Sequence, residues 1–286
     1  MTTLPFLADP IDLVDRGLAP TDLEFSSFLV AGLSYGRVEQ ILKSCAALFE
    51  LLKSAGVPNR GQALHSYLAC VDEKSFARMQ ALLAPWRHRM NTGNDIFFLL
   101  KAFRKLARTE SSLCRLFQKG YSDDAKIQIS NFCGELAALT KSPPARSGGP
   151  WKGTGAQWFF CSPEGGGTSK RLMMWLRWMV RKDARDFGLW TTKGFFSSEY
   201  PAPHPSRLFM PVDAHIFKWA RAQGIVTSKS PTWNSVEAIT AHFLKKRPED
   251  PVFFDFELAH EGMSRVRSLK ETRQTQGVNL KARSFR

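Results

Sequence analysis

Cysteine is scarce in this 286-residue sequence, and its placement excludes several kinds of site. The five cysteines, Cys45, Cys70, Cys114, Cys133 and Cys161, are odd in number, form no Cys-x-x-Cys pair and have no histidine at ligand spacing. This pattern argues against a disulfide scaffold, a zinc site or an iron–sulfur cluster. We therefore expect reduced, mostly buried thiols, no metal and no cofactor.

Long apolar runs are missing as well. The longest ones, such as Leu172 to Leu176, fall far short of the ~18 residues that a membrane span requires. The beginning of the chain, Met1 to Phe6, lacks the basic region and apolar core of a secretory signal. We expect a soluble, cytoplasmic protein that has no membrane partner and acts as a monomer.

Acidic residues are few relative to basic ones, and the imbalance is confined to one half of the chain. The formal net charge is +14; residues 1–140 contain 16 Lys and Arg against 14 Asp and Glu, whereas residues 141–286 contain 24 against 12. A basic half is what a polyanion partner requires, because binding phosphates releases their counterions. A basic surface that serves only solubility is the alternative.

The pattern of apolar residues predicts a mostly α fold. Thr21 to Glu24 reads as a capping box ahead of an apolar run, Phe25 to Leu33, and a second helix begins at Arg37 with one buried stripe. Further helices are expected over Gln62–Cys70, Lys74–Met90, Asn94–Arg108, Ser111–Gln118 and Asp124–Thr140. No stretch of this half shows the two-residue alternation of a sheet.

A proline- and glycine-rich loop, Ser142 to Gly155, marks the boundary between the two halves. We divide the chain into an N-terminal helical region, 1–141, a basic helical region, 142–262, and a basic tail, 263–286. The two helical lobes are expected to form one compact unit with the functional site at their junction.

The residues most suited to binding or catalysis begin at Pro163. Gly165, Gly166 and Gly167 lead into a helix that starts near Ser169. Glycines let a backbone approach a phosphate closely, and the amides at a helix N-terminus carry partial positive charge. A glycine-rich turn without a function is the alternative.

The helix that follows has two expected faces. Its buried stripe comprises Leu172, Trp175, Leu176, Met179 and Val180. Lys170, Arg177 and Arg181 share another face, which we expect to meet anions.

Two segments together resemble a known family. Pro163 to Gly167 followed by Lys170, and Val212-Asp213-Ala214-His215-Ile216-Phe217, resemble the catalytic region of the helix-hairpin-helix DNA glycosylases of the endonuclease III type. Those enzymes pair a leucine-proline-glycine-x-glycine hairpin and a lysine with a valine-aspartate-x-histidine segment. Most of residues 15–262 looks like an uncharacterised bacterial family related to those glycosylases.

The resemblance implies a helix-hairpin-helix glycosylase fold, duplex DNA as partner and excision of a damaged or modified base, without the iron–sulfur cluster of endonuclease III. Asp213 would stabilise the charge that develops on the sugar, and Lys170 would be the nucleophile of an AP-lyase step through a Schiff base. For Asp213 a helix cap, and for Lys170 a phosphate contact, are the alternatives.

The remaining candidate residues bind either the DNA backbone or the flipped base. We expect contacts to DNA from Gly165, Gly166, Gly167, Ser169, Arg171, Arg177, Arg181, His215 and Lys218. Aromatic side chains can stack on a flipped base, and Trp151, Trp190, Phe195 and Phe196 are the candidates for that pocket.

The long aromatic segment between the catalytic pair, Asp183 to Phe209, suggests a pocket enlarged for a bulky lesion or a hypermodified base, as in phage DNA. The role would then be either genome repair or antiviral defence. Two rival functions stay open: a non-catalytic DNA-binding module that retains the hairpin, and an RNA-binding protein.

Overall fold

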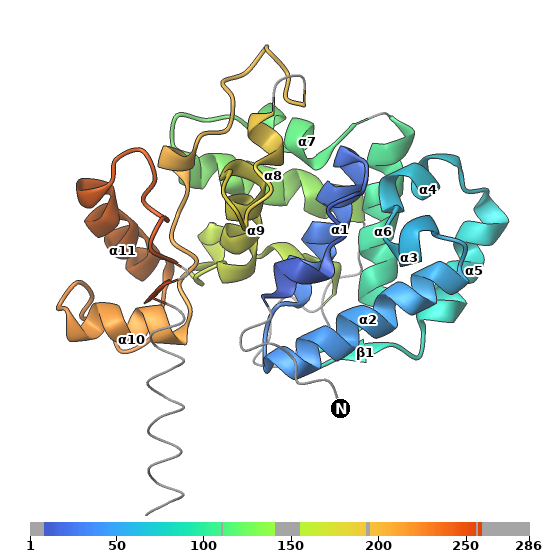
Figure 1. Cartoon of the computed structure of the whole chain (residues 1–286), viewed down its shortest axis with the longest axis horizontal. Coiled ribbons are helices and arrows are strands. Elements are labelled where there is room, and N and C mark those ends of the chain that lie inside the picture. The colour runs from blue at the N-terminus through green and yellow to red at the C-terminus, as the bar shows by residue number, and fades with distance from the viewer. Residues whose placement is uncertain (1–8, 110, 141–154, 193–194, 256, 259–286) are drawn as a thin grey trace, which may run out of the picture.

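The computed structural model describes residues 9–109, 111–140, 155–192, 195–255 and 257–258, and this part of the chain is mostly helical, as predicted (Figure 1). The α-helices are α1 (Pro20–Leu33), α2 (Val38–Ser54), α3 (Pro58–Gly61), α4 (Leu64–Cys70), α5 (Glu73–Leu83), α6 (Gly93–Arg108), α7 (Leu113–Lys119), α8 (Ala125–Thr140), α9 (Lys170–Val180), α10 (Ala214–Ala222) and α11 (Trp233–Lys246). Short 3-10 helices are η1 (Pro10–Leu13), η2 (Ala156–Phe160), η3 (Pro163–Gly165), η4 (Leu189–Thr191) and η5 (Pro205–Arg207). Two short antiparallel strands, β1 (Arg87–His88) and β2 (Asn91–Thr92), complete the described elements.

Helix α1 is the centre of the core. Every residue from Asp22 to Leu33 is buried, and α1 runs through the middle of the molecule in Figure 1. It packs against α9: the rings of Phe28 and Trp175 lie 4.8 Å apart, and Trp175 Nε1 donates a hydrogen bond to Ser27 Oγ at 3.0 Å. This packing fixes the position of α9, whose first residue is Lys170.

The predicted capping box at Thr21 is wrong. Helix α1 begins at Pro20, and Glu24 is completely buried instead of capping the helix start. Its carboxylate accepts hydrogen bonds from the amides of Leu113 (2.8 Å) and Cys114 (2.7 Å) and from Trp190 Nε1 (2.6 Å). Glu24 thus joins three segments that are distant in the sequence.

The predicted helix over Lys74–Met90 is only half right, because α5 ends at Leu83 and the chain then forms the β1–β2 hairpin. Arg89 adopts a left-handed φ of 52° in the turn. Gly93, which starts α6, lies so close to α5 that a Cβ atom there would be 1.7 Å from the carbonyl oxygen of Leu83. The hairpin therefore depends on a contact between elements, which helical periodicity does not reveal.

The segment from Asp183 to Phe209 packs against α7 and α8. Gln118 exchanges two hydrogen bonds with the backbone of Ser197, at 2.9 and 3.2 Å, and Arg207 donates to Gln128 at 3.1 Å. In Figure 1 this segment lies at the top of the molecule, whereas α10 lies at the bottom. The described residues of this segment are therefore held by the helices beside them.

We call Pro163 to Gly167 the glycine hairpin. Helices α10 and α11 form the side of the molecule that faces it. The amide of Trp233, at the start of α11, donates to the carbonyl oxygen of Gly166 at 2.8 Å. The predicted basic tail, 263–286, and most of the predicted boundary loop lie outside the described residues. No helix in the described ranges is both long and apolar enough to cross a membrane.

Candidate active site

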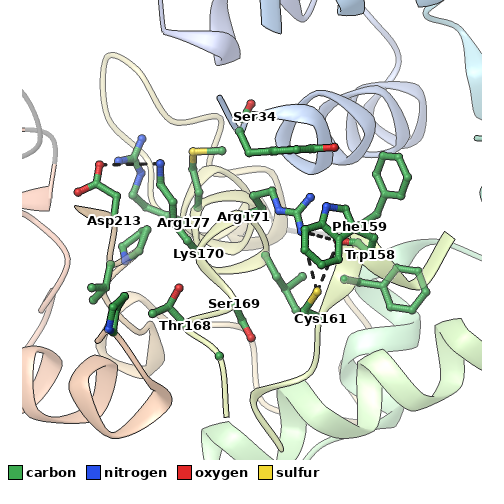
Figure 2. Close-up of a pocket in the computed structure, with 18 of the residues that line it drawn as sticks. Ser34, Trp158, Phe159, Cys161, Thr168, Ser169, Lys170, Arg171, Arg177 and Asp213 are labelled. Carbon is green, nitrogen blue, oxygen red and sulfur yellow. Dashed lines mark hydrogen bonds and ion pairs between the residues drawn. The ribbon is translucent and has the colours of Figure 1, made fainter. Parts of the chain in front are cut away.

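A large cleft opens where the end of α1, the middle of α8, the glycine hairpin, α9 and the start of α10 meet (Figure 2). Its volume is about 1160 Å³. Pockets that bind small molecules usually measure ~300–1,000 Å³, so this cleft can hold a large organic group. Lys170 and Asp213 both line it.

Lys170 and Asp213 meet in this cleft, as the sequence predicts. Lys170 Nζ lies 3.9 Å from Asp213 Oδ2, and Figure 2 shows the two side chains pointing toward each other. The Lys170 side chain is 35% exposed and that of Asp213 is 19% exposed. The pair is therefore partly shielded yet open to a ligand in the cleft. Whether these residues are catalytic stays a prediction.

The two carboxylate oxygens of Asp213 have different surroundings. Oδ1 accepts hydrogen bonds from the amides of His215 (2.8 Å) and Ile216 (2.9 Å) and so caps α10. Oδ2 is the oxygen near Lys170. The cap fixes the side chain, because two backbone donors hold one oxygen while the other remains available for chemistry.

The glycine hairpin borders the cleft and is open on its outer side. Gly166 has a φ of 75°, and Gly165, Gly166 and Gly167 are exposed. A Cβ atom added at any of the three would meet no described atom within 4 Å. Packing within the described residues therefore does not require glycine at positions 165 and 167, and the space beside them is free for a ligand.

The first turn of α9 has no side-chain cap. Ser169, the N-cap residue, has a left-handed φ of 47°, and its hydroxyl is buried without a hydrogen-bond partner among the described residues. Uncapped amides at a helix start attract anions. The predicted DNA contact at Ser169 is thus placed at the cleft wall beside Lys170, where it stays a prediction.

Arg171 points away from Lys170, toward Trp158 (Figure 2). Trp158 and Tyr35 form the aromatic end of the cleft. The Arg171 guanidinium donates to the carbonyl oxygens of Gly32 (2.8 Å) and Trp158 (2.6 Å), and its carbon lies 4.8 Å from the ring centres of both Tyr35 and Trp158. The prediction that Arg171 contacts DNA is wrong, because these bonds hold its guanidinium within the cleft wall.

The predicted anion-binding face of Arg177 and Arg181 is also wrong. Arg177 is only 4% exposed and pairs with Asp255 (2.6 Å) and Asp186 (3.1 Å). Arg181 pairs with Asp183, Asp186 and Asp250 at 2.8–3.0 Å. Burial alone would lower the pKa of Arg177, but Asp255 and Asp186 outweigh it and hold that pKa above its usual value. Both arginines therefore serve internal ion pairs.

The other predicted DNA contacts lie at the start of α10. His215 lines the cleft and is half-buried, whereas Lys218 is exposed one turn further along. Their positions allow the predicted contacts, which stay predictions.

The predicted base pocket is not where the sequence suggests. Trp190 is 0% exposed and lies in the core beside Glu24, and Phe195 and Phe196 pack against the core on the α7 side. None of them lines the cleft, and neither does any other described residue from Asp183 to Phe209. The described part of this segment therefore does not enlarge the cleft. The fourth candidate, Trp151, lies outside the described residues.

Sequence reasoning missed several aromatic and acidic residues of the cleft wall. Tyr35 and Trp158 supply its aromatic end, and Asp9 and Asp255 lie near Arg177. No local pattern marks them, since each comes from a different segment and only the fold brings them together. The described residues contain no group of three or more His, Cys, Asp or Glu side chains arranged to hold a metal ion.

Comparison with known proteins places the chain in one family. A family model described as protein of unknown function (DUF2400) matches residues 9–264, and the chain belongs to this family. No curated protein and no solved structure matches the chain significantly. The family match covers the cleft and both members of the Lys170–Asp213 pair.

Proposed function

We propose that this protein is a DNA glycosylase of the helix-hairpin-helix type, which flips a damaged or modified base out of duplex DNA and excises it. The observation that carries the proposal is the Lys170–Asp213 pair, 3.9 Å apart in a large cleft next to an open glycine hairpin. The two segments that resemble the glycosylase motifs are 42 residues apart in the sequence yet adjacent in space. Mostly helical architecture is compatible with that fold.

In this proposal Asp213 acts on the sugar. Breaking the N-glycosidic bond leaves positive charge on C1′ and the sugar oxygen, and a carboxylate stabilises that charge best when it is fixed before the reaction. Oδ1 is held by two backbone amides, so Oδ2 is presented without reorganisation. The helix cap and the catalytic role are therefore compatible.

Lys170 is the proposed nucleophile. Its amine nitrogen bonds to C1′ while the N-glycosidic bond breaks and its electron pair leaves with the base, and Asp213 Oδ2 is close enough to accept the proton that the amine releases. The adduct then opens: the bond from C1′ to the sugar ring oxygen breaks, that oxygen takes up a proton, and the nitrogen loses one to form a Schiff base, which permits strand cleavage by β-elimination. This lyase step is separable from base release and is tested separately.

Duplex DNA would be held beside the cleft by the hairpin. The amides of Gly165 and Gly166 donate to the carbonyl oxygens of Ser162 and Pro163 within the hairpin. The amide of Gly167 and those at the uncapped start of α9 are the ones offered to a phosphate, and exposed Lys218 adds a cation nearby. A flipped base would enter the cleft, whose volume leaves room for a bulky substituent. The volume of the cleft supports a hypermodified base as substrate. The segment from Asp183 to Phe209 gives no such support.

The first experiment incubates the protein with a panel of damaged and modified duplexes and with phage genomic DNA, and detects free bases by mass spectrometry. We expect one class of base to be released by the wild type and not by Asp213→Asn. Borohydride should trap a covalent adduct that Lys170→Ala lacks. A second variant, Lys218→Ala, serves as a control that weakens binding without removing either proposed catalytic group.

The outcomes separate the rival functions. Tight duplex binding that Asp213→Asn leaves unchanged, without any base release across the panel, would favour a non-catalytic DNA-binding module. Preferential binding of single-stranded RNA would favour an RNA-directed protein. Base release without a trapped adduct would keep the glycosylase and remove the lyase step.

A further inference from the structure

A second polar cluster, formed by Asp9, Arg177 and Asp255, lines the same cleft as the Lys170–Asp213 pair. Asp9 caps η1, Arg177 belongs to α9, and Asp255 follows α11. Lys170 and Arg177 are seven residues apart on α9, so they point to the same side of the helix about two turns, or ~10 Å, apart (Figure 2). We call this cluster the polar subsite.

The guanidinium of Arg177 is buried, but one of its three nitrogens has no hydrogen-bond acceptor. NH1 donates to Asp255 Oδ2 at 2.6 Å and NH2 pairs with Asp186 Oδ1 at 3.1 Å. The third nitrogen carries the Nε–H donor, which has no acceptor in the described part of the chain, although the side chain is only 5% exposed. A buried donor without a partner is costly, so a ligand that supplies an acceptor here gains more than it would at the surface.

The two carboxylates beside Arg177 each have an unused oxygen. Asp9 Oδ1 accepts from the amide of Ile11 at 3.2 Å, and Asp255 uses Oδ2 for Arg177. No described residue donates to the second oxygen of either carboxylate. Burial raises the pKa of Asp9, against the lowering effect of the Ile11 amide and of Arg177.

The subsite therefore offers one donor and two acceptors inside a cleft that the proposed reaction assigns to a flipped base. A complementary ligand presents N–H donors next to a ring acceptor. Cytosine and adenine do so, through an exocyclic amine beside an unprotonated ring nitrogen. Uracil and hypoxanthine present an oxo group in place of the amine, which would face the carboxylate oxygens.

We infer that Asp9, Arg177 and Asp255 form the specificity subsite of the cleft and select a base that carries an exocyclic amine over its oxo counterpart. This inference rests on the proposed function, because it takes the occupant of the cleft to be a flipped base. Asp9 and Asp255 accept from the amine, and Arg177 Nε–H donates to the ring nitrogen. A site built to bond an N–H group discriminates strongly against an analogue that lacks it.

The test measures binding of free bases, which does not depend on catalysis. Cytosine, uracil, adenine and hypoxanthine are titrated into the full-length protein bound to a duplex with a tetrahydrofuran abasic-site analogue, and affinities are measured by calorimetry. We expect cytosine to bind at least tenfold more tightly than uracil, and adenine at least tenfold more tightly than hypoxanthine.

Asp9→Asn is the informative variant, because an amide keeps the size of the side chain but can donate toward an oxo group. It should reduce both preferences at least tenfold. Asp12→Asn, an exposed position in the same short helix, is the matched control and should leave both preferences unchanged. A melting curve for each variant establishes that it is folded.

Four results would overturn the subsite: equal affinities of amine and oxo bases for the wild type, a preference that survives Asp9→Asn, a loss of preference in Asp12→Asn as well, or no binding of any of the four bases. If base release from DNA is nevertheless observed and requires Asp213, the glycosylase stands and only the subsite falls. If base selection is present while release is absent, the subsite stands and the reaction needs revision.

Discussion

The carboxylate of Asp213 combines a structural and a proposed chemical role, and substitutions can separate the two. Asparagine also caps helices well, whereas alanine does not. We therefore expect Asp213→Asn to keep the free energy of unfolding near that of the wild type and to lose base release. Asp213→Ala should lose base release too and, in addition, ~1 kcal/mol of stability.

Urea unfolding of the wild type and both variants measures this difference. If Asp213→Asn and Asp213→Ala lose equal stability, the bonds from the His215 and Ile216 amides to Oδ1 do not support α10 as described. If Asp213→Asn releases bases at the rate of the wild type, Asp213 is a cap only.

Glu24 is the residue whose ionisation should be most visible in the pH dependence of stability. Burial raises its pKa to about 7, against the lowering effect of its three hydrogen-bond donors. A carboxyl whose folded pKa is raised contributes stability that is full below its unfolded pKa, ~4.3, and is lost as pH rises through the folded pKa. The window for this loss runs from about pH 4.3 to pH 7.

We predict that the free energy of unfolding of the wild type, measured relative to that of Glu24→Gln, decreases by roughly 3 kcal/mol as pH rises through this window. The comparison removes contributions from groups that the two proteins share. Urea unfolding at closely spaced pH values tests it. A difference that stays constant or increases with pH would show that Glu24 is ionised throughout, held by its donors.

Lys170 and Asp213 could be predicted from the sequence because each lies in a short local pattern, a glycine turn before a helix and an aspartate at a helix start. Arg177 and Trp190 could not be placed in the same way. Their partners, Asp255 and Glu24, lie 78 and 166 residues away. Local periodicity reports which face of a helix is polar, but it does not distinguish a solvated charge from a buried ion pair.

At the level of elements, the C-terminal half of α9 is fixed by ion pairs. Asp186 receives a hydrogen bond from Arg181 NH1 at 2.9 Å and pairs with Arg177 NH2 at 3.1 Å, and its side chain is only 1% exposed. Removing one partner of a buried pair leaves uncompensated charge, which typically costs ~3–5 kcal/mol. We predict that Asp186→Ala destabilises the protein by about 3 kcal/mol.

Glu50→Ala is the matched control for that prediction, since the Glu50–Lys53 pair on α2 is more than half exposed on both sides. Exposed pairs contribute ~0–1 kcal/mol, so this variant should unfold close to the wild type in urea. Equal effects of the two substitutions would mean that the pairs around Arg177 do not hold α9 in place.

The helices predicted over Asn94–Arg108 and Asp124–Thr140 are found nearly to the residue, as α6 and α8. The prediction failed where an element depends on a neighbour. The β1–β2 hairpin follows α5 because Gly93 approaches Leu83 closely, and the segment from Asp183 to Phe209 is held by Gln118 and Gln128. The aromatic residues of that segment serve packing, which composition alone does not separate from binding.

For the molecule as a whole, charge is the property that relates most directly to the proposed partner. The net charge is +14, but three of the positive side chains, Arg171, Arg177 and Arg181, form bonds inside the protein. Contacts with DNA phosphates must then come from exposed cations, of which Lys218 on α10 lies nearest in sequence to Asp213. Each such contact releases counterions and makes binding dependent on salt.

We predict that the affinity for duplex DNA falls steeply with salt concentration and that Lys218→Ala lowers the slope of log K against log salt by about 1. Lys74→Ala is the matched control, because Lys74 is exposed on α5, at the opposite edge of the molecule from α10 (Figure 1). Fluorescence anisotropy of a labelled duplex over a salt series gives both slopes. Equal slopes for the two variants would show that DNA does not lie along the α10 side of the cleft, and tighter binding of single-stranded RNA in the same assay would favour an RNA partner.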